Sequence, residues 1–216
     1  MSRGDLFLTT KIKNENFGYD ATMKSFDESL TKMQTDYADL LLLHWPVKDK
    51  LRDSWRTLEE IQEAGRARSI GVSNYTIKNL EDMKTYAKVM PAINQVELHV
   101  FLQQPELLKY CSENNIAVEA YSPLAHFVSF ENPIIEAIAA KHGRTYAQIM
   151  LRWCVEQGLI VLPKSITPER IASNFEIFDF SLDEKDMKAL KKLERNFRTC
   201  WDPETDPRAD GVSLNI

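Results

Sequence analysis

The stretch that decides the fold is ADLLLLH, residues 38–44. Its apolar run is short, it is interrupted only by Asp39, and it ends at His44. Continuous apolar runs of this length are typical of strands that are covered on both faces, as in parallel sheets. The same order of an apolar run, a polar residue and a helical stretch recurs along the chain, so this segment serves as a template for the rest.

Five more apolar runs fit the template. They are residues 6–10, 67–72, 92–98, 116–120 and 159–162. Helical spacing of apolar residues predicts helices near residues 20–33, 52–64, 77–87, 105–114, 133–141 and 146–157, a helix that opens at 167–168, and a last helix near 183–193. Units of about 30 residues that alternate strand and helix predict an α/β protein with a parallel sheet.

Two architectures are compatible with these units, a doubly wound sheet and a barrel. Polar or reactive residues fall at or just after the carboxyl ends of most runs, and in a (β/α)₈ barrel those ends meet at one mouth. Such a barrel needs eight strands and typically about 250 residues, whereas this chain has 216. We therefore predict a TIM (β/α)₈-type barrel that lacks its first two βα units and keeps six parallel strands. It would form one domain over residues 1–216, with a C-terminal helix and tail at 181–216.

Composition narrows the class of protein. The net charge is −5, hydrophobic residues make up 44%, and no basic block is present, which argues against a nucleic-acid partner. No apolar run approaches the length of a membrane span, and residues 1–20 lack the layout of a secretory signal. Cys111, Cys154 and Cys200 form no CxxC pair, and we interpret them as structural thiols in a cytoplasmic protein.

Lys11 and His44 are the candidate catalytic residues. Lys11 ends the first apolar run, where it could stabilise a neighbouring anion or have a lowered pKa; alone, a surface lysine is the simpler interpretation. His44 precedes Trp45 and suits proton transfer or carbonyl polarisation, although a structural histidine is equally compatible. The other histidines, His99, His126 and His142, are interpreted as structural or surface residues, and no spacing indicates a metal site.

The segment PKSITPER, residues 163–170, indicates an anion site. After a strand come Lys164 and Ser165; Thr167 takes the capping position, a proline the first helical position, and Arg170 lies in the first turn. A helix N-terminus favours anions, and the arginine fork suits phosphate. A well-capped helix with incidental charges is the plain alternative. No GxGxxG is present, so a Rossmann phosphate loop is not expected.

Together these segments resemble the aldo-keto reductase superfamily. The similar segments are DLFLTTK (5–11), DLLLLHWP (39–46), IGVSN (70–74), NQVELH (94–99), EAYSPL (119–124) and LPKSITPERIASN (162–174). The resemblance extends from about residue 5 to 193. It implies a barrel that uses NADPH to reduce a small-molecule aldehyde or ketone, with hydride passing from the nicotinamide to the carbonyl carbon and a tyrosine protonating the oxygen.

Each site residue follows from this resemblance by position. Lys11 would lower the pKa of the tyrosine, and His44 would orient the substrate carbonyl. Trp45 and Trp201 could line the substrate pocket. The implied cofactor residues are Ser73, Asn74 and Gln95 for the carboxamide, Tyr121 for stacking, Ser122 and Leu124 for the pyrophosphate, Lys164, Ser165, Thr167 and Arg170 for the 2′-phosphate, and Asn174 for the adenine. Ser173 departs from the family, in which many members have Glu.

The family's catalytic Asp and Tyr come from its first two βα units, and no tyrosine of this chain lies in the corresponding motif. The sequence therefore predicts an NADPH-dependent reductase whose 216-residue form is impaired. One alternative is a non-catalytic barrel that binds a nucleotide or a partner. Another is a lysine Schiff-base aldolase using Lys11 or Lys164, which would leave the 163–170 segment unexplained. The carbonyl substrate and the oligomeric state are not predicted.

Overall fold

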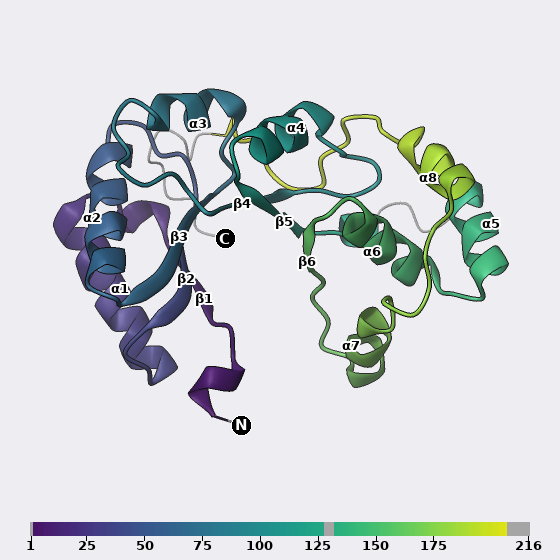
Figure 1. The fold of residues 1–216 in the computed structure, drawn as a ribbon, viewed down its shortest axis with the longest axis horizontal. Helices are drawn as coiled ribbons and strands as arrows, with labels where there is room; N and C mark the ends of the chain where they lie inside the picture. Colours follow the sequence, from purple (N-terminus) through teal and green to yellow (C-terminus); the bar gives the residue numbers. More distant parts are fainter. Residues whose placement is uncertain (1, 128–131, 207–216) are drawn as a thin grey trace. The chain divides into compact units, whose positions relative to one another are not determined.

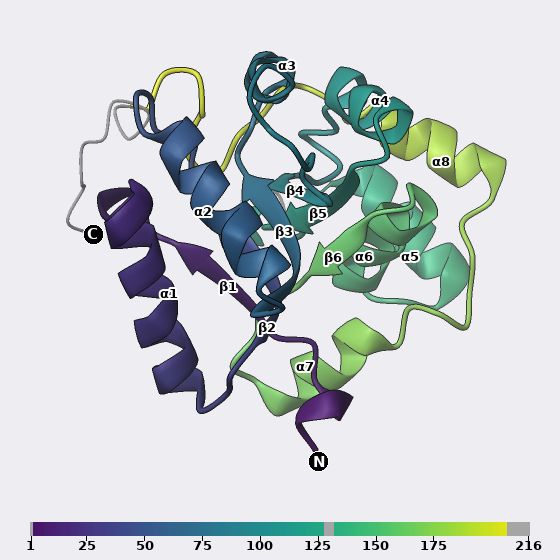
Figure 2. The same cartoon turned by 60° about the vertical axis from the view of Figure 1, so that its left-hand side comes forward.

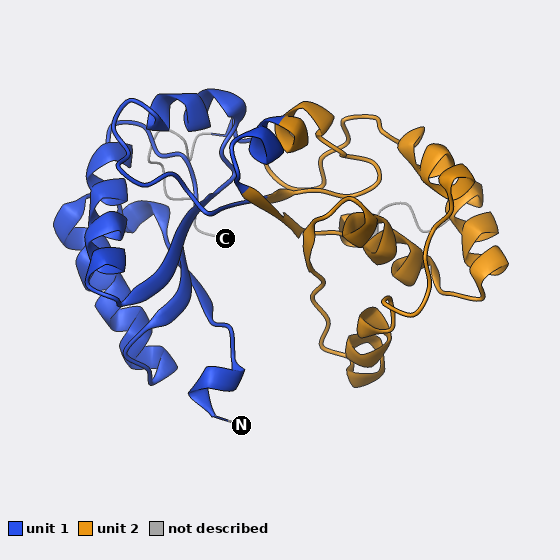
Figure 3. Cartoon of the chain, in the orientation of Figure 1, with its two compact units in different colours: residues 1–95, 110–116, 202–216 blue, residues 96–109, 117–201 orange. Residues whose placement is uncertain are grey.

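The computed structural model describes residues 2–127 and 132–206. They form two compact units (Figure 3). Unit 1 comprises residues 1–95, 110–116 and 202–216, and unit 2 comprises residues 96–109 and 117–201. The predicted single domain over 1–216 remains a prediction, and the last ten residues of its predicted tail, 207–216, lie outside the described residues.

The elements of unit 1 alternate strand and helix (Figure 1). They are β1 (Thr9–Ile12), α1 (Tyr19–Met33), β2 (Ala38–Leu43), α2 (Leu51–Glu63), β3 (Ala67–Ser73), α3 (Ile77–Met83) and the first part of β4 (Ile93–Glu97), with short 3₁₀ turns at Arg3–Asp5 and Asn14–Asn16. The end of α4 (Pro105–Glu113) also belongs to this unit. Helices α1 and α2 pack on each other and on the strands that precede or follow them (Figure 2).

Unit 2 contains the end of β4, the start of α4 and the later elements. These are β5 (Ala117–Tyr121), a 3₁₀ turn (Ala125–Phe127), α5 (Pro133–His142), α6 (Tyr146–Glu156), β6 (Ile160–Leu162), α7 (Pro168–Phe175) and α8 (Glu184–Lys191). Helix α6 packs on α5, α7 and β6, and α8 packs on α5. None of the helices in the described parts of the chain is long and apolar enough to cross a membrane.

Strand order distinguishes the two predicted architectures. The six strands follow one another in the sheet in chain order, β1-β2-β3-β4-β5-β6, and the pairs β1–β2, β2–β3, β3–β4 and β5–β6 are parallel. A doubly wound sheet reverses its strand order part-way across, whereas a barrel sheet does not. The predicted α/β fold with six parallel strands of the barrel type is therefore confirmed.

The core of unit 1 is centred on β2. Leu40 to Leu43 are fully buried, and Trp55 and Leu58 of α2 are also inaccessible. Each such side chain contributes about 1.5–3 kcal/mol through burial. Gly71 of β3 lies so close to its neighbours that an added Cβ would come within 2.7 Å of the Ile93 carbonyl oxygen. Glycine is therefore required where β3 passes between β2 and β4.

The first strand begins later than the sequence predicts. Leu6 and Phe7 lie outside β1 and are 40% and 68% exposed. The Leu8 amide donates to the Asp39 carboxylate at 2.9 Å, and pairing of β1 with β2 begins only at Thr9. The expected strand over residues 6–10 is therefore wrong at its start: Leu6 and Phe7 are outside the strand, and the amide of Leu8 donates to a side chain instead of to a backbone carbonyl. Similarly, α3 ends at Met83, before the predicted end of that helix at residue 87.

Candidate functional site

A cavity of about 700 Å³ lies within unit 2. Its wall comes from the loop after β5, the start of α6, the turn after β6, and α7. The predicted cofactor residues that line it are Ser122, Leu124, Lys164, Ser165, Thr167, Arg170 and Asn174. These residues are separated by up to about 50 positions in the sequence, and the fold of unit 2 brings them to one surface.

The chemistry of the wall suits a polyanion. Lys164 and Arg170 supply positive charge at the amino end of α7, and among the described residues that line the cavity there is no Asp or Glu. Ser165, Thr167 and Ser173 also line the cavity and carry hydroxyl groups. A helix N-terminus with an arginine and hydroxyl groups beside it can bind phosphate, so the residues present fit a phosphorylated dinucleotide.

The turn before α7 differs in one detail from the prediction. Thr167 occupies the N-cap position, but its side chain makes no capping hydrogen bond. Instead, the Ser165 hydroxyl oxygen accepts from the Thr167 amide at 3.1 Å. The expectation that Thr167 caps the helix is therefore right in position, but its side chain does not make the capping bond.

The loop after β5 has an uncommon backbone. Ser122, Ala125 and His126 all have positive φ angles of 47–49°, which cost roughly 1–3 kcal/mol each for residues other than glycine. The Ser122 hydroxyl lies 2.8 Å from His126 Nε2, and both residues line the cavity. His126 was interpreted as a structural or surface residue, so its place on the wall was missed. Its position four residues after Ser122, close to EAYSPL, is a signal that could have indicated it.

A second group of predicted residues lies in unit 1, at the ends of β3 and β4. The Ser73 hydroxyl donates to the Gln95 carbonyl at 2.8 Å, and Asn74 Nδ2 contacts the Ser73 hydroxyl at 3.1 Å. Asn74 Nδ2 also donates to the His44 carbonyl at 3.2 Å. All three predicted carboxamide residues are buried, at 1%, 5% and 3% exposure for Ser73, Asn74 and Gln95. They form one hydrogen-bonded set.

The two predicted catalytic residues lie on neighbouring strands of unit 1. Lys11 is the third residue of β1 and pairs in register with Leu42, and His44 directly follows β2. The His44 amide donates to the Ile12 carbonyl at 3.1 Å, and the His44 side chain is exposed. Both are therefore at the carboxyl ends of paired strands, the end at which barrel enzymes carry catalytic groups.

The remaining predicted residues are placed as follows. Tyr121 is the last residue of β5, and its carbonyl accepts from the Leu98 amide at 3.3 Å. Trp45 is 2% exposed in unit 1, and Trp201 is 43% exposed in unit 2. No cluster of three or more His, Cys, Asp or Glu that could hold a metal occurs in residues 2–127 and 132–206.

Comparison with known proteins shows the family. Residues 1–195 match the model of the Aldo/keto reductase family. The chain is 44% identical over 204 residues to an uncharacterised oxidoreductase of Bacillus subtilis, and 42% identical over 204 residues to the glyoxal reductase of the same organism. These alignments cover 94% of this chain and 73% and 74% of the relatives. The chain belongs to the aldo-keto reductase family, and it spans about three quarters of the length of these relatives.

Solved structures agree with this assignment. An aldo-keto reductase from a Medee basin deep-sea metagenome library matches with a TM-score of 0.93 at 40% identity, covering 95% of this chain and 78% of that one. A Bombyx mori aldo-keto reductase in complex with NADP matches with a TM-score of 0.89 at 33% identity, covering 97% and 75%. The predicted family is confirmed, and the predicted cofactor agrees with the ligand of the Bombyx mori protein. The roles of individual residues stay predictions.

Proposed function

We propose that the cavity of unit 2 binds the 2′-phosphate and pyrophosphate of NADPH, and that this binding serves the reduction of an aldehyde or ketone. The observation that carries the proposal is the cavity wall, where Lys164 and Arg170 lie together at the N-terminus of α7. The similarity to the glyoxal reductase of Bacillus subtilis and to the Bombyx mori aldo-keto reductase in complex with NADP supports the same class of reaction.

The residues of this chain would act in three ways. Lys164, Arg170 and the hydroxyls beside them neutralise and orient the phosphates, because charge-assisted hydrogen bonds are the strong ones at such a site. Ser73, Asn74 and Gln95, already hydrogen-bonded to one another, hold a carboxamide by paired donors and acceptors. His44 orients a carbonyl oxygen, and Lys11 stabilises an anion beside it. NADPH supplies the hydride when it is bound.

The proton donor expected for this family is a tyrosine, and none of the tyrosines in residues 1–216 lies in the motif that carries it in the family. We propose that the 216-residue chain by itself reduces carbonyl compounds at a negligible rate. Loss of a positioned general acid typically lowers the rate by about 10²–10⁴-fold. The cytoplasmic location also remains part of this proposal.

The first experiment measures dinucleotide binding. NADPH and NADH are titrated separately while tryptophan fluorescence is followed. We expect NADPH to bind about tenfold more tightly than NADH, since one additional charge-assisted contact contributes roughly 1.5–3 kcal/mol. Equal affinities, or no quenching by either compound from a cooperatively folded chain, would contradict the proposal for the cavity.

The second experiment tests whether the 216-residue chain reduces a carbonyl compound by itself. NADPH oxidation is followed by the loss of absorbance of the reduced nicotinamide at about 340 nm, with a reactive aldehyde as the substrate. Rapid turnover by the 216-residue chain would show that no further segment is needed. NADPH binding with negligible turnover is the expected result.

A further inference from the structure

Glu97, the last residue of β4, is a fully buried carboxylate that none of the predicted roles uses. Its Oε1 accepts from the Thr199 amide at 2.6 Å and from the Thr199 hydroxyl at 2.5 Å. The Cys200 amide lies 3.2 Å from Oε1 and 3.1 Å from Oε2. One side chain thus receives three donors from a segment about a hundred residues further along the chain.

His99 completes this arrangement. Its Nδ1 accepts from the Phe101 amide at 3.3 Å, so the ring proton of a neutral imidazole lies on Nε2, which contacts Glu97 Oε1 at 3.2 Å. Burial raises the pKa of Glu97, but the hydrogen bonds from His99 and Thr199 outweigh it and hold the pKa below its usual value. The carboxylate therefore stays charged and needs its donors, because an unsatisfied buried charge is costly.

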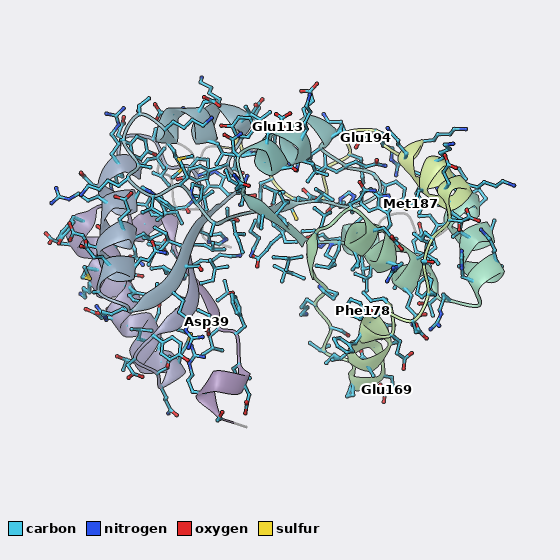
Figure 4. The ribbon with its side chains drawn as sticks, viewed as in Figure 1. Asp39, Glu113, Glu169, Phe178, Met187 and Glu194 are labelled. Atoms are coloured by element: carbon cyan, nitrogen blue, oxygen red, sulfur yellow. The ribbon has the colours of Figure 1, made fainter. Side chains whose placement is uncertain are left out.

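The same segment is attached at its other end. The Gln103 amide donates to the Glu194 carboxylate, and Glu194 is labelled in Figure 4. The Arg195 and Phe197 amides both donate to the Phe101 carbonyl, at 3.3 and 3.0 Å. We name residues 194–200 the strap. One end of the strap is held to the loop after β4 and the other to Glu97 at the end of β4, entirely within unit 2.

The strap ends on the rim of the cavity. Cys200 Sγ lies 3.2 Å from His126 Nε2 and 3.5 Å from the Ser122 hydroxyl, and those two residues line the cavity. Ser122 and His126 are also the residues with strained, positive φ angles. A strained loop persists only where its surroundings hold it, and the strap supplies contacts on the side of Cys200.

We propose that Glu97 is a positioning residue for the cofactor cavity: it clamps Thr199 and Cys200, and thereby holds the Ser122–His126 loop in the shape that receives the dinucleotide. The proposal rests on the proposed function for its effect on NADPH. Its structural half, the position of Cys200, is independent of any ligand. Glu97 acts on the cavity through the strap.

The thiol of Cys200 reports on the clamp. Cys111 and Cys154 are fully buried, and burial raises the pKa of the Cys111 thiol to about 11 and that of Cys154 still further. Cys200 is partly exposed, so of the three cysteines it is the one that a thiol reagent reaches in the folded protein. Labelling with a chromogenic disulfide, with the labelled site identified by mass spectrometry, measures how firmly the strap is held.

The variants are Glu97→Gln and Thr199→Val, with Thr199→Ser as the matched control that keeps the hydroxyl. We expect Glu97→Gln to raise the rate of Cys200 labelling roughly tenfold through local opening, and Thr199→Val to raise it less. Thr199→Ser should label like the wild type. In every variant Cys111 and Cys154 should stay protected. If the Glu97→Gln variant does not fold into a state that unfolds cooperatively, the labelling rates of Thr199→Val and Thr199→Ser are compared instead.

NADPH titration completes the test. We expect the Kd for NADPH to rise several-fold in Glu97→Gln and Thr199→Val and to be unchanged in Thr199→Ser. Unchanged Cys200 labelling in both variants overturns the proposal, as does labelling of all three cysteines in step, which would indicate general loosening. Faster Cys200 labelling with an unchanged Kd overturns the link to the cavity. Should the wild type not bind NADPH, the proposed function fails, and the labelling rates still decide whether Glu97 positions Cys200.

Discussion

Asp39 and Glu97 are both buried carboxylates on strands of the sheet, yet they lie at different ends of their strands. Asp39, labelled in Figure 4, is the second residue of β2 in unit 1, and Glu97 is the last residue of β4. Asp39 contacts Arg3 at 2.8 Å, Arg68 at 3.0 Å and the Leu8 amide at 2.9 Å. Glu97 instead receives hydrogen bonds from the strap and from the His99 ring.

The difference shows what each end of the strands does. The charged partners of Asp39 join the chain start to β2 and β3, and Arg3 and Arg68 also contact the ring of Tyr37, with guanidinium carbons 3.9 and 4.6 Å from its centroid. No cavity residue is involved, so this cluster serves stability. Glu97 holds a segment that reaches the cavity rim. In barrels the amino ends of strands carry stability and the carboxyl ends carry function.

The substitution Asp39→Asn tests the role of the Asp39 carboxylate in stability and should have the largest effect. The Leu8 amide, together with Arg3 and Arg68, holds the pKa of Asp39 below its usual value, so the carboxylate is charged at neutral pH. We expect the substitution to lower the free energy of unfolding by about 3 kcal/mol, because it removes hydrogen bonds to a buried charged group. Urea unfolding measures this loss.

The exposed neighbour Asp36 provides the matched control, and Asp36→Asn should change the stability by less than about 0.5 kcal/mol. The Kd for NADPH should be the same in both variants. An Asp39→Asn protein with wild-type stability, or one with weakened NADPH binding and intact stability, would contradict the assignment of this end to stability.

Arg170→Met tests the opposite end and should have the next largest effect. Arg170 is exposed and lines the cavity. We expect NADPH to bind about tenfold more weakly, since a charge-assisted contact to phosphate is lost, while NADH binding and unfolding by urea stay unchanged. The preference for NADPH should also depend less on salt. Equal losses for NADPH and NADH would argue against a contact with the 2′-phosphate.

The smallest effect is expected from Lys141→Met. This substitution removes the lysine of a surface charge cluster that is far from Asp39 and Glu97 in the sequence. Lys141 Nζ lies 2.6 Å from Asp183 and 2.8 Å from Asp186, and this contact lowers the pKa of Asp183 to about 2. The unfolded pKa of Asp is about 3.9. The stabilisation is therefore fully present above pH 4 and is lost as the pH falls through about 2.

Thermal unfolding at several pH values measures this prediction. The difference in Tm between wild type and Lys141→Met should be constant from about pH 7 to about pH 5. It should shrink as the pH falls below the unfolded pKa of Asp, about 3.9, and approaches about 2. Lys185→Met, which changes an exposed lysine at the start of α8, the helix that carries Asp186, is the control. A difference that grows on acidification would contradict the direction of the Asp183 pKa shift.

Much of the fold could be predicted from residue patterns. The β2 run was predicted with its exact bounds, Ala38–Leu43, because an apolar segment of that length between helices has few other solutions. The start of β1 was predicted wrongly, because an apolar pattern does not reveal that the Asp39 side chain takes the Leu8 amide. Local patterns therefore predict elements better than their ends.

The candidate site divides in the same way. The segment 162–174 identified Lys164 and Arg170 from local chemistry, a helix N-terminus with basic residues. His126 and Glu97 were missed, although Glu97 lies inside the quoted segment NQVELH. Their importance depends on Cys200 and Thr199, which are far away in the sequence. No local pattern reports such a partner.

The sequence by itself determined the class of fold, the family and the chemical character of the cofactor segments, because periodicity, strand-end residues and ordered motifs are local properties. Only the tertiary structure decided which carboxylate joins β1, β2 and β3 and which one holds the strap. Asp39 and Glu97 are the same kind of group on the same kind of strand. What distinguishes them is the set of donors that folding brings to each, arginines in one case and the His99 ring and the strap in the other.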